Sequence, residues 1–152
     1  MNEQTRFYRR RLPHWREQAS IYFVTWRLKP DQQELSPEER ALVAAELHHG
    51  RGQRYELHAY VVMNDHVHVL VEPKGGRVLE KLLHSWKSFT AHGLQRTSGR
   101  QGGVWQDEYF DRIVRDEQEF AQKLEYIRGN PWKRWPDLRE YPWVWPRADP
   151  KR

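Results

Sequence analysis

Residues 60–72 read Tyr-Val-Val-Met-Asn-Asp-His-Val-His-Val-Leu-Val-Glu, and the rest of the chain is organised around them. This stretch predicts two β-strands that meet at a tight turn over Asn64 and Asp65. After the turn, polar and apolar residues alternate, so His66 and His68 face one side of the sheet and the valines face the other. Imidazoles at positions i and i+2 of a strand lie roughly 6.5 to 7 Å apart along the backbone. The pair can converge on one metal ion, although a plain amphipathic strand shows the same alternation.

The patterns on either side of this hairpin predict further strands and helices. We expect strands over residues 19–28, 55–63 and 66–72, and a strand or irregular ribbon over residues 104–114. We expect helices over residues 37–48, 78–95 and 116–129, the last ending before Pro131. The order β-α-β-β-α-β followed by a helix predicts an α+β fold of the ferredoxin-like split β-α-β type. In such a fold the helices between the strands pack on one face of an antiparallel sheet, and here the C-terminal helix that carries Tyr126 is added to that arrangement.

The predicted helices carry apolar stripes that identify their buried faces. In the helix over residues 78–95 the stripe is Leu79, Leu82, Leu83, Trp86 and Phe89. In the last helix it is Phe120, Leu124 and Ile127. Beside that second stripe, at steps of four, three and four, lie Glu119, Lys123, Tyr126 and Asn130. A closing helix that lies across the sheet opposite His66 and His68 would bring Tyr126 to the histidine pair.

The chain divides by composition into an arm, one domain and a tail. Its 152 residues fit a single domain. Residues 1–18 form a basic, aromatic arm, and residues 19–131 form the domain that carries the histidine pair and Tyr126. Residues 132–152 form a Trp- and Pro-rich tail that we expect to be irregular and to dock by its tryptophans. The net charge of +5 and the aromatic content of 13% favour a polyanionic partner such as unpaired nucleic acid.

The composition also excludes several kinds of chemistry. The absence of cysteine excludes disulfides, zinc–thiolate sites and thiol nucleophiles. No apolar run approaches the length that spans a membrane, and the first residues lack the hydrophobic stretch of a signal peptide. We therefore expect no membrane partner and a cytoplasmic, nucleoid-associated location.

Four motifs occur in a fixed order along the chain. They are Val-Val-Met followed by His-Val-His, then residues 84–90 (His-Ser-Trp-Lys-Ser-Phe-Thr), residues 104–112 (Val-Trp-Gln-Asp-Glu-Tyr-Phe-Asp-Arg) and residues 126–131 (Tyr-Ile-Arg-Gly-Asn-Pro). Each motif alone is weak, but the ordered set is specific. It resembles the single-tyrosine HUH transposases, and within them the REP-associated tyrosine transposases of the IS200-like group. The resemblance covers residues 9–131, most of the chain.

The resemblance implies a metal-dependent endonuclease and strand transferase that acts on single-stranded DNA near a hairpin such as a REP element. It implies that His66 and His68 bind the metal, that Tyr126 is the nucleophile, and that Asn130 is a third ligand. Two imidazoles and an amide oxygen suit Mg²⁺ or Mn²⁺, although imidazoles also take Zn²⁺. Attack by the tyrosine oxygen forms a 5′-phosphotyrosyl enzyme and releases a 3′-hydroxyl, which a second strand can reverse without ATP.

Basic side chains are the candidates for contacts with DNA phosphates or bases. They are Arg9, Arg10, Arg11, Lys87, Arg112, Arg115 and Arg128.

The sequence departs from the family in two places. The turn before the histidines is Asn64-Asp65 where relatives commonly carry Pro-Asn, and Trp132 begins a run that replaces the relatives' Val-Lys-Ala-Gly. The first change can place an extra carboxylate near the metal.

Three other functions are compatible with the sequence. One is a non-catalytic binder of structured single-stranded DNA or RNA, another is a metal-dependent hydrolase in which Tyr126 only packs, and the third is a purely structural protein. The chain can act as a monomer or as a homodimer, in which the tyrosine helix serves either its own histidines or those of the second subunit.

Overall fold

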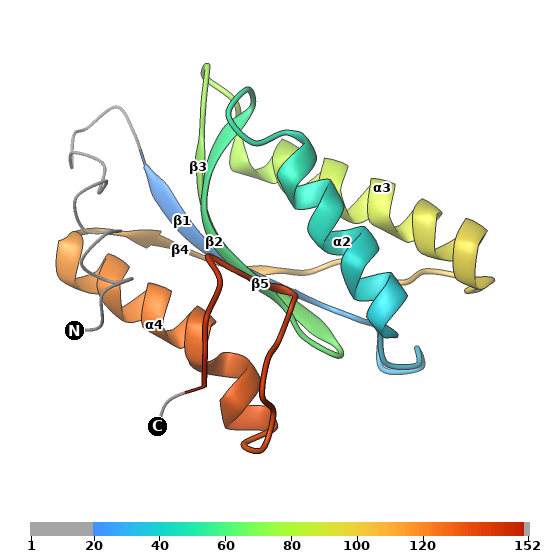
Figure 1. The fold of residues 1–152 in the computed structure, drawn as a ribbon. Helices are drawn as coiled ribbons and strands as arrows, with labels where there is room; N and C mark the ends of the chain where they lie inside the picture. Colours follow the sequence, from blue (N-terminus) through green and yellow to red (C-terminus); the bar gives the residue numbers. More distant parts are fainter. Residues whose placement is uncertain (1–19, 151–152) are drawn as a thin grey trace.

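The computed structural model describes residues 20–150. It has a five-stranded antiparallel sheet with helices on both faces (Figure 1). The strands are β1 (Ile21–Arg27), β2 (Tyr55–Val62), β3 (His66–Pro73), β4 (Phe110–Val114) and β5 (Val144–Trp145), in the spatial order β4-β1-β3-β2-β5. The helices are α2 (Pro37–His49), α3 (Leu79–Ser98) and α4 (Glu117–Arg134). The predicted α+β class is confirmed. No helix within residues 20–150 is long and apolar enough to cross a membrane.

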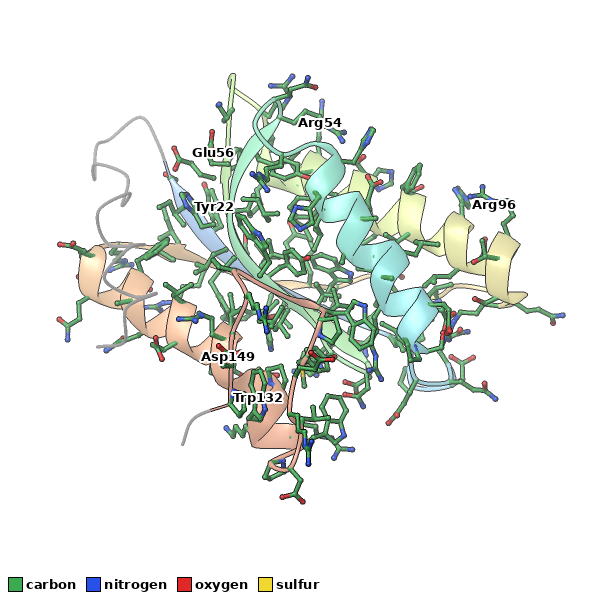
Figure 2. All side chains as sticks on the ribbon, in the orientation of Figure 1. Tyr22, Arg54, Glu56, Arg96, Trp132 and Asp149 are labelled. Atoms are coloured by element: carbon green, nitrogen blue, oxygen red, sulfur yellow. The ribbon has the colours of Figure 1, made fainter. Side chains whose placement is uncertain are left out.

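Strand alternation creates two separate cores, one on each face of the sheet. Val24 and Trp26 of β1 and Val67 and Val69 of β3 face α2 and α3. Phe23 of β1 and the β3 residue Leu70 belong to the core under α4. Side chains fill the space between the sheet and the helices on both faces (Figure 2). The hairpin at residues 64–65 is confirmed, and the side chains it supplies alternate between the two cores as expected.

The face under α2 and α3 is held by packing and by one buried ion pair. Ser36 and Glu39 form a capping box at the start of α2. The Glu39 carboxylate also accepts from the Arg100 guanidinium, at 2.6 Å from Nε and 2.8 Å from the second nitrogen. Both side chains are buried, so this pair ties α2 to the segment after α3.

The predicted stripe of α3 needs one correction. Trp86 is 1% exposed, but Phe89 is 56% exposed and lies outside the core. After Trp86 the buried positions continue at Thr90 and Leu94, in steps of four. A step of three from Trp86 therefore turns Phe89 to the edge of the helix and into solvent.

The end of the chain differs from the expectation at two points. α4 does not stop before Pro131 but continues through it to Arg134. Proline removes one donor from the helix, but Pro131 is itself buried, and Trp135 N donates to the Pro131 carbonyl at 2.7 Å, so the helix continues past it. The tail is not wholly irregular, because β5 pairs with β2. Its tryptophans do pack against the cores, as expected.

The strand expected over residues 104–114 is shorter in the structure, where it covers only its C-terminal half. Regular pairing with β1 covers only Phe110–Val114, and residues 104–109 carry a single bridge, between Trp105 and Leu28. Lys29 N donates to the Val104 carbonyl and Gln106 N donates to the Arg27 carbonyl, both at 2.9 Å. These bonds hold the segment beside β1 without a continuous ladder.

Candidate functional site

The register of β1 on β3 fixes the centre of the site. Thr25 lies opposite His68, and Arg27 lies opposite His66. The two imidazole rings are in contact, with 4.7 Å between their centroids. α4 packs across this face and brings the Tyr126 ring to 5.2 Å from the ring of His68. The structure therefore joins three of the residues that the sequence singled out, from two elements that are far apart along the chain.

His68 is buried and bonded on one side only. Its side-chain Nδ1 is 2.6 Å from the hydroxyl oxygen of Thr25. Its Nε2 is buried and has no hydrogen-bond partner among residues 20–150. Burial, together with the nearby His66, Arg27 and Lys123, lowers the pKa of His68 to about 3. The ring is therefore neutral near pH 7, and its free nitrogen is of the kind that ligates metals.

His66 is held in a similar way by its neighbour in the turn. Its Nδ1 is 2.7 Å from a carboxylate oxygen of Asp65. Burial lowers the pKa of His66, and the hydrogen bond to Asp65 opposes this shift. A carboxylate that accepts from Nδ1–H leaves Nε2 as the nitrogen with a free lone pair. The carboxylate expected near the histidines is thus present, and it contacts the outer side of the ring.

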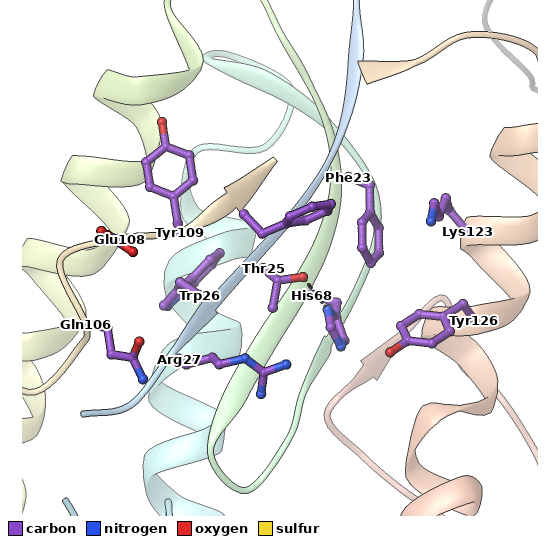
Figure 3. Close-up of a pocket in the computed structure, with 11 residues that line it drawn as sticks. Phe23, Thr25, Trp26, Arg27, His68, Gln106, Glu108, Tyr109, Lys123 and Tyr126 are labelled. Atoms are coloured by element: carbon purple, nitrogen blue, oxygen red, sulfur yellow. Dashed lines mark hydrogen bonds between the residues drawn. The ribbon is translucent and has the colours of Figure 1, made fainter. Parts of the chain in front are cut away.

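An open cavity of about 660 Å³ lies beside His68 and Tyr126. Figure 3 shows Tyr126 and Lys123 extending from α4, with Phe23, Thr25 and Arg27 following one another along β1. Tyr126 is 44% exposed, so its hydroxyl can be reached from solvent. The Nζ of Lys123 lies 4.8 Å from the centre of the Phe23 ring. The cavity therefore combines an accessible phenol, a buried imidazole, two cationic side chains and the carboxylate of Glu108.

Asn130 lies on α4 one turn after Tyr126 and is 8% exposed. It is not among the residues that line the cavity. Within residues 20–150 there is no group of three or more His, Cys, Asp or Glu side chains that could hold a metal ion. The structure thus brings His66, His68 and Tyr126 together but leaves the role of Asn130 as a prediction.

The basic residues proposed to contact DNA are dispersed. Arg9, Arg10 and Arg11 lie outside the described residues. Lys87 lies on α3, where its Nζ donates to the Asp107 carbonyl at 3.0 Å. The remaining three are near α4: Arg112 is paired with Glu119 at 2.6 Å, Arg115 is exposed, and Arg128 is buried and donates to the Arg147 carbonyl. A buried guanidinium presents little surface to DNA. The contact of Arg128 with the Arg147 carbonyl holds the structure together instead, and the sequence did not indicate it.

Comparison with known protein families identifies the chain. The family model described as "Transposase IS200 like" matches residues 8–130. The chain belongs to this family. A comparison with curated proteins gave no significant match.

Solved structures show that this transposase shares its fold with known relatives. One is a REP-associated tyrosine transposase bound to a REP hairpin, with a TM-score of 0.65 and 17% identity over 88% of this chain and 82% of that one. Another is a candidate transposase from Deinococcus radiodurans R1, with a TM-score of 0.54 and 24% identity over 76% of this chain and 94% of that one. The expected fold resemblance is confirmed.

Several site residues of this transposase were missed by sequence reasoning. Thr25, Arg27 and Phe23 share a face with His68 only because β1 pairs with β3 in one particular register. The helical period placed Lys123 on the same helix edge as Tyr126. It did not indicate that Lys123 lines a cavity next to β1. Phe110 lines the cavity through the pairing of β4 with β1. The alternation within β1 was the one available signal for the residues of that strand.

Proposed function

We propose that this transposase cleaves and rejoins single-stranded DNA near a hairpin, with Tyr126 as the nucleophile. The family supports DNA transposition, and one structural relative is described as bound to a REP hairpin. The observation that carries the proposal is the contact between Tyr126 and His68 at the open cavity, with 5.2 Å between the two rings. We further propose that the protein works in the cytoplasm, in association with the nucleoid.

Covalent attack by Tyr126 accounts for both cleavage and rejoining. The phenol oxygen forms a bond to the scissile phosphorus, and the bond from phosphorus to the 3′ oxygen breaks. The phenol loses a proton and the departing 3′ oxygen gains one, so the reaction requires no other reactant. The product is a 5′-phosphotyrosine and a free 3′-hydroxyl. Because one phosphodiester replaces another, a second strand's 3′-hydroxyl can reverse the step without ATP.

A divalent metal such as Mg²⁺ or Mn²⁺ fits the residues present. His68 Nε2 is buried without a hydrogen-bond partner in the described part of the chain, which leaves its lone pair available to a ligated ion. Both imidazoles have their Nδ1 atoms engaged, by Thr25 and by Asp65, so both would present Nε2. Asn130 is the proposed third ligand. When bound, such an ion neutralises and polarises the scissile phosphate.

Arg27 and Lys123 supply positive charge on the same side of the sheet. Both line the cavity with Tyr126, and both contribute to the low pKa of His68. A phosphodiester carries a negative charge that repels a nucleophile, and fixed cations reduce this repulsion. We propose that these two side chains orient the DNA strand so that the scissile phosphate faces Tyr126.

The test is covalent adduct formation with end-labelled, hairpin-containing single-stranded DNA in Mg²⁺ or Mn²⁺, resolved on a denaturing gel. We expect the wild type to form an adduct, and Tyr126→Phe to bind the DNA and form none. A chelator should also abolish the adduct. Tyr22→Phe is the matched control, because Tyr22 packs against the core under α2 and α3, on the other face of the sheet. This variant should retain the adduct.

Two outcomes would replace this proposal with one of the alternatives. Tight binding with no cleavage by any variant across a diverse DNA pool would make the protein a binder of structured single strands. Cleavage that persists in Tyr126→Phe without an adduct would make it a hydrolase in which water attacks.

A further inference from the structure

The edge of the sheet opens beside the proposed nucleophile. β4 pairs with β1 so that Phe110 faces Thr25. If this register continued, Leu28 would face Asp107, but it faces Trp105 instead. Two extra residues are therefore accommodated in the segment before Phe110, which must bow away from β1. The opening that results is the part of the 660 Å³ cavity lined by Gln106, Glu108, Tyr109 and Phe110.

A row of aromatic rings connects this opening to Tyr126. Phe110 is 55% exposed, and its ring lies 6.5 Å from that of Phe23, edge to face. Phe23 in turn lies 5.4 Å from His68 and 6.0 Å from Tyr126. An aromatic ring that is exposed in the wall of a cavity offers a surface on which a flat, apolar group can stack. The group that stacks on Phe110 would be close to the residue that attacks the phosphate.

Polar groups surround this aromatic surface. Gln106 is fixed in place, because its side-chain nitrogen donates to the Leu28 carbonyl at 3.0 Å and its backbone N donates to the Arg27 carbonyl. The Arg27 guanidinium forms no ion pair with any residue in the range 20–150, and it lines the same cavity. Figure 3 shows Arg27 and Gln106 on the side of the cavity below Trp26. Flat apolar walls with a few fixed hydrogen-bonding groups are typical of sites that bind one ring-shaped ligand.

We infer that this cavity binds one unpaired nucleobase of the DNA strand, next to the phosphate that Tyr126 attacks, with Phe110 as its stacking platform. This inference rests on the proposed function and adds to it a residue that determines the substrate. The volume lies within the range of about 300 to 1,000 Å³ that is usual for sites of small ligands. A base within a duplex is stacked and paired, so it cannot enter. The cavity therefore selects single-stranded DNA at the cleaved position.

The test measures binding, which does not depend on cleavage. The probe is a fluorescent DNA hairpin with single-stranded flanks, in which an abasic site replaces one flank nucleotide at a time. For the wild type, we expect one flank position at which loss of the base weakens binding by about 10-fold to 100-fold. Phe110→Ala should weaken binding of the intact probe by a similar factor. In that variant, the abasic site at the same position should have no further effect.

Matched variants separate stacking from loss of structure. Phe110→Tyr keeps a flat ring and should bind like the wild type, whereas Phe110→Leu keeps the apolar bulk and should bind like Phe110→Ala. Phe89→Ala is the control, because Phe89 is 56% exposed on α3 and does not line this cavity. It should leave both affinity and abasic sensitivity unchanged. Mapping of the cleaved bond should then place it next to the sensitive position.

The inference is overturned if no flank position is sensitive in the wild type, or if the sensitivity persists undiminished in Phe110→Ala. A sensitive position remote from the cleaved bond would likewise overturn it. Failure of the proposed function has a different signature. In that case no adduct with Tyr126 forms, while the binding measurements still show whether Phe110 stacks on a base.

Discussion

The two faces of the β1–β3 pair use the same strands for different purposes. On the face toward α2 and α3, alternate residues such as Val24, Trp26 and Val67 are at most 1% exposed and pack in an apolar core. On the face toward α4, the positions between them include Thr25 and His68, which are also buried but polar. The first set of side chains fills an apolar core, whereas the second borders an open cavity beside Tyr126.

The difference shows where this fold can tolerate buried polar groups. Burial of an imidazole without a full set of hydrogen bonds costs free energy. Packing on the apolar face offsets that cost. On the other face, His68 is neutral and has one hydrogen-bonded nitrogen, and we propose that its second nitrogen ligates the metal. We therefore expect substitutions on the first face to act mainly on stability, and substitutions around His68 to act mainly on function.

The largest effect on stability should come from Trp86→Ala. Trp86 is buried on α3, its ring stacks on Trp26 at 5.8 Å, and its Nε1 donates to the Tyr55 hydroxyl at 3.3 Å. Removing so large a buried side chain should lower the free energy of unfolding by about 3 to 5 kcal/mol in chemical denaturation. Phe89→Ala, on the exposed edge of the same helix, should change it by less than about 0.5 kcal/mol. If Trp86→Ala and Phe89→Ala lowered the free energy of unfolding equally, the assignment of Trp86 to the core and of Phe89 to the exposed edge of α3 would be wrong.

A somewhat smaller effect, with a defined pH dependence, should come from Glu39→Gln. The Arg100 guanidinium holds the pKa of Glu39 at about 2, below the ordinary value of 4.5. Because the folded pKa is lowered, the ionised carboxylate stabilises the fold fully above pH 4.5, and this contribution is lost as the pH falls from 4.5 to 2. The shift corresponds to about 3 kcal/mol near neutral pH.

Chemical denaturation of both proteins at several pH values checks this expectation. The difference between wild type and Glu39→Gln should narrow steadily as the pH falls below 4.5. Glu38→Gln is the control, because Glu38 is an exposed carboxylate in the same first turn of α2. If the difference in the free energy of unfolding between wild type and Glu39→Gln stayed constant down to the lowest pH, the ion pair of Glu39 with Arg100 would not be the source of this stabilisation.

The smallest loss of stability, joined to a clear loss of function, should come from Thr25→Val. The exchange keeps the volume but removes the hydroxyl that bonds His68 Nδ1. Leaving that nitrogen without a partner should cost about 1 to 3 kcal/mol. Loss of ring orientation should slow adduct formation with single-stranded DNA by about 10-fold to 100-fold. Thr97→Val removes a hydroxyl from α3 and should leave adduct formation intact; if it slowed the reaction equally, the hydroxyl of Thr25 would have no special role.

Local patterns predicted the elements that depend on neighbouring residues. Helix signals placed a helix over residues 37–48, close to the observed α2, and alternation assigned His66 and His68 to one face. Patterns failed where a distant contact decided the outcome. Phe89 has the spacing of a core residue but lies outside the core. Pro131 has the character of a helix stop, yet packing at the end of α4 overrides it.

The sequence by itself determined which side chains point together within each element: the two histidines along β3, and Lys123, Tyr126 and Asn130 along α4. These relations follow from the periods of the strand and the helix, which depend only on the backbone. The tertiary structure alone decided that the Tyr126 ring contacts His68, that Thr25 bonds its Nδ1, and that a bulge before Phe110 opens a cavity beside them. Such contacts depend on the register of paired strands and on the packing of one helix, and no local period encodes either.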